Sequence, residues 1–348
     1  METRLTPKPY VLCIRMLTFP HARPRARAHD PRLWKPLTQE GASRAGDPMT
    51  GEIIDGKRVA DEIRSELRGR LDRLRSQGVN PGLAAILVGD NPGSQLYVKM
   101  KGKACEEMGM AHRTIAMPAE TSQERLLSVV GELNADPEVH GILVQQPLPP
   151  HISVDAAVRA VDPRKDVDCF HPENVGLVLI GSPRFAPATP AGVVELLVRS
   201  GNPPQGKDVV IAGRSNIVGK PLAALLIQKA PKANATVTVV HTATRDLAAH
   251  TRRADILVAA MGSPGTIHAD MVKDGAVVID VASNRISDPT KKSGYRTVGD
   301  VDFETVREKA KAITPVPGGV GPMTIAMLLV NTVTAAESIS GVPPTSSP

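Results

Sequence analysis

The stretch that decides the fold lies in the second half of the chain and reads Val209-Val210-Ile211-Ala212-Gly213-Arg214-Ser215-Asn216-Ile217-Val218-Gly219-Lys220-Pro221. Its first four residues are typical of a buried strand, and Pro221 stands where a helix begins. Glycines between the two let the backbone approach a phosphate, and the N-terminus of the helix favours negative charge. Many strand-to-helix turns contain glycine for steric reasons alone, and the spacing here is not G-x-G-x-x-G. The segment alone predicts a strand, a turn and a helix, and leaves a nucleotide site open.

The same alternation of strands and helices extends in both directions from this stretch. Apolar residues at spacings of three and four predict a helix from Val59 to Leu74. The other expected elements are strands over 83–88, 141–144, 208–212, 236–240, 256–260 and 276–281, and helices over 97–108, 221–229 and 323–338. This order predicts an α/β fold with parallel sheet, in which ligands bind at the carboxyl ends of the strands. Residues 162–190 are rich in Pro, Gly and His and are interpreted as the connection between two domains.

The charge distribution argues against nucleic acid and membrane partners. The chain of 348 residues has a net charge of +6. Residues 1–48 hold nine Lys/Arg and four Asp/Glu, which leaves about +1 for the rest. A general DNA-binding or membrane-surface role therefore loses its main support. Only 2% of the residues are aromatic, so the core must consist of aliphatic residues and Met.

The cysteines and the hydropathy pattern favour a cytoplasmic enzyme. Cys13, Cys105 and Cys169 are far apart and match no metal-ligand spacing, so no metal site is expected. An odd and sparse count fits a reducing compartment. No stretch approaches the roughly 20 apolar residues that a spanning helix needs.

Residues 1–48 show no sustained period of two or of 3.6 and are expected to lie outside the fold. They include Arg-Pro-Arg-Ala-Arg-Ala at 23–28. Three interpretations stay open: a basic targeting segment, a disordered arm that touches polyanions, or an upstream start codon with Met49 as the working initiator. The last is favoured because regular structure begins directly after Met49.

The residues after the second strand of the nucleotide-binding half favour NADP over NAD. NAD enzymes usually place Asp or Glu there to hold the ribose 2′-hydroxyl. Here Val240 is followed by His241-Thr242-Ala243-Thr244-Arg245, with no acid before Asp246. The hydroxyls of Thr242 and Thr244, with Arg214, suit a 2′-phosphate. The alternative is that the arginines are merely solvated.

Six motifs together resemble one family, the bifunctional methylenetetrahydrofolate dehydrogenase/methenyltetrahydrofolate cyclohydrolases. The resemblance covers Ile53 to about Glu337. The motifs are Val88-Gly89-Asp90-Asn91-Pro92 with Tyr97 and Lys101, Val144-Gln145-Gln146-Pro147-Leu148-Pro149, Lys165-Asp166-Val167-Asp168, the 213–221 turn, Gly299-Asp300-Val301-Asp302, and Thr314-Pro315-Val316-Pro317-Gly318-Gly319-Val320-Gly321-Pro322-Met323-Thr324.

The resemblance implies two activities, two domains and a cofactor. The activities are NADP-dependent oxidation of 5,10-methylenetetrahydrofolate to the methenyl form and hydrolysis of that product to 10-formyltetrahydrofolate. Residues 49–188 with the C-terminal helix 320–340 are expected to form an α/β folate-binding catalytic domain. Residues 189–319 are expected to form a Rossmann-like NADP-binding domain, with a cleft between the two. The expected partners are tetrahydrofolate one-carbon derivatives and a second copy of the chain in a homodimer.

The resemblance also assigns the site residues. Tyr97 and Lys101 are four apart on a helix and therefore face the same way, so that the ring can stack on a pterin while the amine reaches its reactive carbon. Gln145 is expected to hydrogen-bond Lys101, and Asp168 to accept hydrogen bonds from the pterin. The full expected set is Lys101, Gln145 and Asp168 for catalysis; these three with Tyr97, Pro317, Gly318 and Gly319 for folate; and Gly213, Arg214, Ser215, Ile217, Gly219, Thr242, Thr244 and Ser283 for the cofactor.

Each of these residues also has a purely structural interpretation. A lysine on a helix is usually a solvated charge, as expected for Lys99 and Lys103. A Gln at a strand end is often a turn residue, Asp168 could cap a turn, and the 317–319 loop could simply begin a helix tightly.

The chain departs from the family pattern at several positions. Cys169 stands where the family usually has Gly, Leu177 where it has Arg, and Ala188 where it has Cys. Ala282-Ser283 replaces Gly-Ile where the nicotinamide should lie. Two alternatives follow: a family member with cyclohydrolase activity only, or a non-catalytic nucleotide-binding regulatory protein on the same fold.

Overall fold

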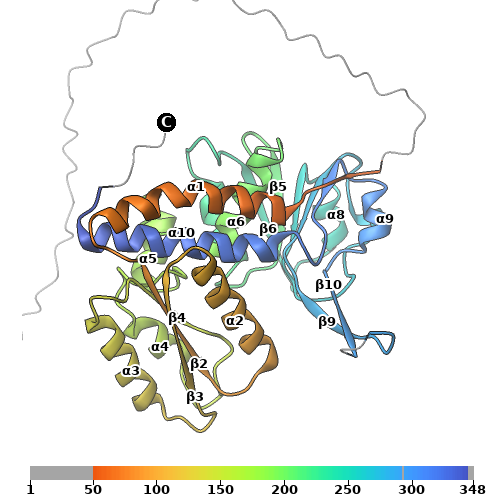
Figure 1. Cartoon of the computed structure of the whole chain (residues 1–348). Coiled ribbons are helices and arrows are strands. Elements are labelled where there is room, and N and C mark those ends of the chain that lie inside the picture. Colours follow the sequence, from red (N-terminus) through yellow and green to blue (C-terminus); the bar gives the residue numbers. More distant parts are fainter. Residues whose placement is uncertain (1–49, 292–293, 344–348) are drawn as a thin grey trace, which may run out of the picture. The chain divides into compact units, whose positions relative to one another are not determined.

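The computed structural model describes residues 50–291 and 294–343. The expectation for residues 1–48 lies outside the described residues. The remainder contains two parallel sheets, as the α/β pattern predicts (Figure 1). The predicted strands Gly141–Val144, Asp208–Ala212 and Thr236–Val240 are confirmed with the same bounds.

The smaller sheet has three parallel strands in the order β3-β2-β4, formed by Ala111–Met117, Gly82–Val88 and Gly141–Val144. Every residue of β2 is buried because this strand lies in the middle. The helices that accompany this sheet are α2 (Pro92–Glu107), α3 (Gln123–Ala135) and α4 (Val154–Ala160). Helix α2 begins five residues before Tyr97, because the Asn91 side chain accepts hydrogen bonds from the N–H groups of Gly93 and Ser94.

The larger sheet has six parallel strands in the order β1-β11-β8-β7-β5-β6. Their bounds are Glu52–Ile53, Ala312–Ile313, Val277–Asp280, Ile256–Ala259, Asp208–Ala212 and Thr236–Val240. The helices of this half are α6 (Ala188–Arg199), α7 (Gly219–Leu226), α8 (Leu247–Thr251), the 3-10 helix Ala269–Met271 and α9 (Phe303–Arg307). A separate antiparallel hairpin is formed by β9 (Asn284–Ser287) and β10 (Tyr295–Val298). Helix α5 (Pro172–Leu179) lies in the segment interpreted as the connection.

The two ends of the described chain are joined in the structure. Strand β1 pairs in parallel with β11, and helix α1 (Gly56–Ser76) lies along α10 (Val320–Ser340), orange against blue in Figure 1. The buried carboxylate of Glu337 fixes α10 to α1 through Arg70 at 2.6 Å and Arg73 at 2.8 Å. The first residues of the fold are therefore held by the last.

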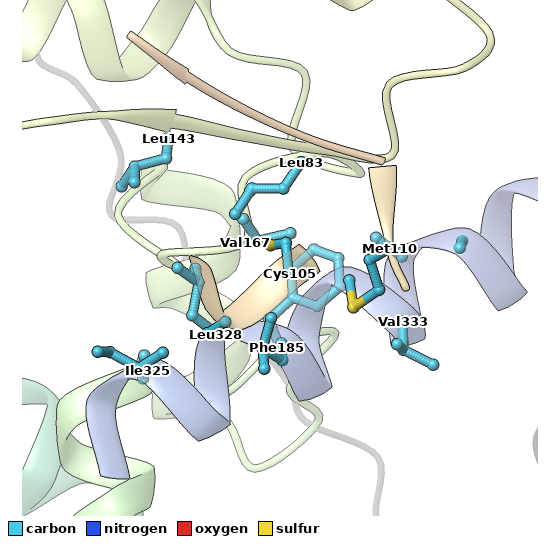
Figure 2. Packing of buried hydrophobic residues seen from close by; sticks show 14 of the residues in the cluster. Leu83, Cys105, Met110, Leu143, Val167, Phe185, Ile325, Leu328 and Val333 are labelled. Carbon is cyan, nitrogen blue, oxygen red and sulfur yellow. The ribbon is translucent and has the colours of Figure 1, made fainter. Parts of the chain in front are cut away.

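Helix α10 contributes to two hydrophobic cores. Ile325, Leu328 and Val333 pack with Leu83, Leu143 and Phe185 in the core beside the smaller sheet, as Figure 2 shows. Val320, Met323 and Ala326 pack in the core of the larger sheet. The helix is long and apolar enough to cross a membrane, contrary to the expectation from sequence, but most of it is buried inside the protein. Its composition is that of a core helix.

Candidate active site

Helix α2 presents Tyr97 and Lys101 on one face. Tyr97 is 38% exposed and has a flat ring, whereas Lys101 is only 7% exposed. The neighbouring Lys99 and Lys103 are exposed, and Lys103 pairs with Glu107 at 3.6 Å, so both fit the solvated interpretation. Burial therefore separates Lys101 from the other lysines of its helix.

The end of β4 supplies the partner of Lys101. The Nζ atom of Lys101 donates to Oε1 of Gln145 at 3.2 Å, as predicted. The Nε2 atom of Gln145 donates to the carbonyl of Gln146 at 2.7 Å, which fixes the amide so that its oxygen faces the lysine. Gln145 thus leaves part of the hydrogen-bonding capacity of the amine for another group.

Lys101 and Asp168 form a coupled pair of titratable groups. Burial lowers the pKa of Lys101, and the charge of Asp168 partly opposes this shift. Burial raises the pKa of Asp168 to about 6; the charge of Lys101 opposes this shift, while that of Asp166 adds to it. The pKa values of both groups are shifted in the direction of neutral pH, which suits proton transfer.

The loop before α10 is shaped by close backbone packing. Gly318 has φ 111°, and a Cβ on Gly319 would lie 2.7 Å from the carbonyl oxygen of Pro315. A Cβ on Gly56 of α1 would lie 1.7 Å from the Gly319 carbonyl oxygen. The predicted turn at 317–319 is present, with Pro317 exposed. Contact of Pro317, Gly318 and Gly319 with a folate stays a prediction.

The predicted nucleotide turn joins β5 to α7. Gly213 has φ 135°, and a Cβ there would meet the Ala260 carbonyl oxygen at 2.2 Å. A Cβ on Gly219 would meet the Gly213 carbonyl oxygen at 2.1 Å. Arg214, Ser215 and Ile217 are exposed along the turn. Such a turn leaves open backbone in front of a helix N-terminus, where a pyrophosphate fits.

The end of β6 offers hydroxyls and no free acid. Thr242 is exposed, and the Thr244 hydroxyl accepts the N–H of His241 at 2.9 Å, so its own hydrogen is available to a phosphate oxygen. The carboxylate of Asp246 accepts the N–H of Ala249 at the start of α8. With that acid bound to a helix, the donor set fits a 2′-phosphate better than a bare 2′-hydroxyl.

The strand ends beside this site are held by two buried carboxylates whose roles the sequence did not reveal. Asp300 accepts the N–H groups of Met261, Gly262 and Ser263, and Asp280 accepts those of Asp300 and Val301. Burial raises the pKa of Asp280 to about 6. The Gly299-Asp300-Val301-Asp302 motif was the available signal. Ser283 is exposed three residues after the end of β8, and its contact with the cofactor stays a prediction.

Comparison with known proteins agrees with this geometry. The catalytic-domain model described as "Tetrahydrofolate dehydrogenase/cyclohydrolase, catalytic domain" matches residues 54–168, and the NAD(P)-binding domain model of that family matches residues 187–340. The chain belongs to the tetrahydrofolate dehydrogenase/cyclohydrolase family.

Members of the tetrahydrofolate dehydrogenase/cyclohydrolase family match almost over their full length. The bifunctional protein FolD of Chlorobium phaeovibrioides is 56% identical over 288 residues, which are 82% of this chain and 98% of the relative. The bifunctional enzyme FolD of Campylobacter jejuni has 49% identity and a TM-score of 0.77, over 82% of this chain and 98% of its own. The FolD of Trypanosoma brucei, solved with NADP cofactor and an inhibitor, has 44% identity and a TM-score of 0.80, over 84% and 99%.

Within residues 50–291 and 294–343, no group of three or more His, Cys, Asp or Glu side chains is arranged to hold a metal ion.

Proposed function

We propose that this protein oxidises 5,10-methylenetetrahydrofolate with NADP⁺ and hydrolyses the resulting 5,10-methenyltetrahydrofolate to 10-formyltetrahydrofolate. The observation that carries the proposal is the buried amine of Lys101, held by Gln145 and electrostatically coupled to Asp168, on the same helix face as Tyr97. Family membership and full-length similarity to bifunctional relatives support it.

In the hydrolytic step, Lys101 acts on the water. Its lowered pKa increases the fraction of neutral amine, which accepts a proton as the water oxygen bonds to the methenyl carbon. The C–N bond to the pterin nitrogen then breaks as that nitrogen takes up a proton and the new hydroxyl loses one, which leaves the formyl group on the other nitrogen. Gln145 holds the amine in place, and Tyr97 and Asp168 bind the pterin by stacking and by accepting its N–H groups.

In the oxidative step, the protein positions two flat rings. NADP⁺ supplies the hydride acceptor. We assign Gly213, Arg214, Ser215, Ile217 and Gly219 to the phosphates and adenosine side, Thr242 and Thr244 to the 2′-phosphate, and Ser283 to the nicotinamide half. Hydride transfer requires no acid or base from the protein, only alignment of the reactants.

The domain division follows the same proposal. We assign folate binding to residues 49–188 with helix 320–340, and the cofactor to residues 189–319. Because β1 belongs to the larger sheet and α10 to both cores, neither assignment is a separable piece of chain. The active form is proposed to be a cytoplasmic homodimer.

A second candidate is a family member with cyclohydrolase activity alone. It is favoured by Ala282-Ser283, which stand at the end of β8 beside the proposed nicotinamide position. All residues assigned to hydrolysis are present in either case.

One coupled assay tests both candidates. Purified protein with methylenetetrahydrofolate and NADP⁺ is followed by absorbance for NADPH and for methenyltetrahydrofolate, and the hydrolysis of added methenyltetrahydrofolate is measured separately. Bifunctional activity predicts NADPH formation with little methenyl accumulation. Hydrolysis without NADPH formation would establish the second candidate, and neither activity would refute both.

A further inference from the structure

Three buried polar residues near Asp168 use their side chains to bind backbone groups: Lys165, Asp166 and Asn331. Lys165 is 6% exposed, and its Nζ donates to the carbonyls of Leu133, Asn134 and Asp136 at 3.1, 2.8 and 2.7 Å, where α3 ends. The carbonyls of Leu133 and Asp136 also accept backbone N–H groups, from Asp136 and Val139, so the lysine adds to the hydrogen bonds that end the helix. The start of the loop is thereby attached to the end of α3.

The carboxylate of Asp166 closes the loop on its other side. It accepts the N–H groups of Phe170 at 3.1 Å and His171 at 2.8 Å and the Nδ2 group of Asn174 at 2.8 Å. Cys169 lies between Asp166 and Phe170 in the sequence and has φ 60°, a strained conformation for a residue with a side chain. Three hydrogen bonds to one carboxylate hold this turn in place.

Asn331 of α10 reaches the same loop from the far end of the sequence. Its Nδ2 donates to the carbonyl of Val167 at 2.7 Å and to that of Ala186 at 2.8 Å. The side chain is 4% exposed, so water cannot easily replace these bonds. Val167 directly precedes Asp168, so Asn331 fixes the peptide group from which Asp168 extends.

Asp168 differs from its neighbours, because no residue in the described part of the chain hydrogen-bonds its carboxylate. We propose that Asn331 is a positioning residue: it fixes the backbone before Asp168, as Asp166 does after it, and so keeps the Asp168 carboxylate free to accept the pterin N–H groups. This inference rests on the proposed role of Asp168 in folate binding.

The test is a double-mutant cycle on tetrahydrofolate binding, measured by calorimetry under anaerobic conditions. Asn331→Ala should weaken tetrahydrofolate binding about tenfold, within the range found for residues of one hydrogen-bond network. In an Asp168→Ala background the same substitution should have little further effect. Binding of NADP⁺ should be unchanged in every variant.

The matched control is Thr332→Val on the same helix. The buried Thr332 hydroxyl donates to the Leu328 carbonyl at 2.9 Å and has no hydrogen bond to the loop. This variant should melt at a lower temperature, as Asn331→Ala should, without a change in tetrahydrofolate affinity. A merely structural role of Asn331 would make the two variants behave alike.

The possible outcomes are distinct. If the Asn331→Ala and Asp168→Ala effects simply add, or if Asp168→Ala leaves the affinity unchanged, the inference is wrong. If the unsubstituted protein binds tetrahydrofolate but has neither activity, the proposed function fails while the cycle still decides the inference. Should Asn331→Ala not fold, Asp166→Asn replaces it in the cycle, with the same expected coupling to Asp168.

Discussion

Lys101 illustrates how a residue acquires a function through its surroundings. A charged amine in a protein interior is costly unless it is paired, and the response is a lowered pKa. Gln145 accepts one hydrogen bond from the amine, and Asp168 contributes negative charge without forming an ion pair with it. The amine is therefore held in place but is available to a water molecule.

Replacing Lys101 by Met should remove the proton acceptor and retain most of the buried volume. Hydrolysis of methenyltetrahydrofolate should fall by about 10²–10⁴-fold, the usual contribution of a positioned acid or base. NADP⁺ reduction should fall less, so methenyl product should accumulate. The control is Lys103→Met, the same substitution on the exposed face of the same helix, which should leave both rates unchanged. Near-normal hydrolysis in a folded Lys101→Met protein would return Lys101 to a structural role.

The pH dependence should report the coupled pair. Ionised Asp168 is required to accept pterin N–H groups, so kcat/KM for hydrolysis should fall as the pH drops below about 6. Deprotonated Lys101 is required as the base, so kcat/KM should increase further as the pH rises through the lowered pKa of the amine. Removing the carboxylate in Asp168→Asn also removes the charge that raises the pKa of Lys101. The part of the pH profile that reports the Lys101 amine should then move to lower pH. A move to higher pH would contradict the electrostatic coupling between Asp168 and Lys101.

Arg214 should contribute most of the preference for NADP⁺ over NAD⁺. Arg214→Ala should reduce this preference by about 1.5–3 kcal/mol, the range for hydrogen bonds to charged groups. The measurement is the ratio of kcat/KM for the two cofactors, with Arg245→Ala as the comparison. Equal values for both cofactors in the unsubstituted protein would refute the 2′-phosphate assignment.

The sequence predicted the contact between Lys101 and Gln145 better than the hydrogen bonds that hold the loops around them. Lys101 and Gln145 belong to motifs, and their predicted hydrogen bond is present. Asn331 gave no signal, because its partner Val167 lies 164 positions earlier and nothing local marks a buried Asn on a helix. The roles of Asp166 and Asp300 depend on backbone N–H groups whose positions exist only in the folded loop.

At the scale of elements, the turn between β5 and α7 depends on glycine for two separate reasons. Gly213 needs a positive φ, and both Gly213 and Gly219 allow carbonyl oxygens to approach closer than a Cβ would permit. The turn therefore has little freedom to adjust.

Gly213→Ala should displace this turn and weaken NADP⁺ binding by at least about tenfold, a loss of about 1.4 kcal/mol. Methenyltetrahydrofolate hydrolysis should be retained, because the residues assigned to it lie on α2, directly after β4 and in the Asp168 loop, outside this turn. Gly131→Ala is the control: it lies in α3, where an added Cβ meets nothing within 4 Å, and should leave cofactor binding unchanged. Equal loss of both activities in Gly213→Ala would indicate general unfolding instead.

Strands with long apolar runs were predictable, whereas β1, β3 and β11 were not. β2 is a continuous apolar run, and so is β5 after the exposed Asp208, which is the pattern of a strand covered on both faces. β3 contains His112, Arg113 and Thr114 and is largely exposed at the edge of its sheet, so its sequence lacks that pattern. β1 and β11 are two residues long and are defined by their pairing with distant strands.

At the scale of the whole molecule, α10 makes the two halves interdependent. Its residues fill both hydrophobic cores, and Asn331 and Glu337 connect it to the Asp168 loop and to α1. The family resemblance placed helix 320–340 with residues 49–188, but the packing of the same helix in the core of the larger sheet was not predicted, because no local pattern indicates it.

A chain that begins at Met49 should fold and function like the full chain. The described residues begin at Thr50 and β1 begins at Glu52, so a start at Met49 removes none of the described contacts. The measurements are the melting temperature and both specific activities. A clear loss in either would assign a role to residues 1–48.

The pairing of β1 with β11 and of α1 with α10 also has a consequence for biosynthesis. A ribosome produces α1 before almost all other described elements and α10 after them, so the apolar side of α1 that packs on α10 is left without this partner until α10 has been translated. The two hydrophobic cores to which α10 contributes are completed only when this helix leaves the exit tunnel, and the nascent chain depends until then on partial contacts such as those of α1 with α6.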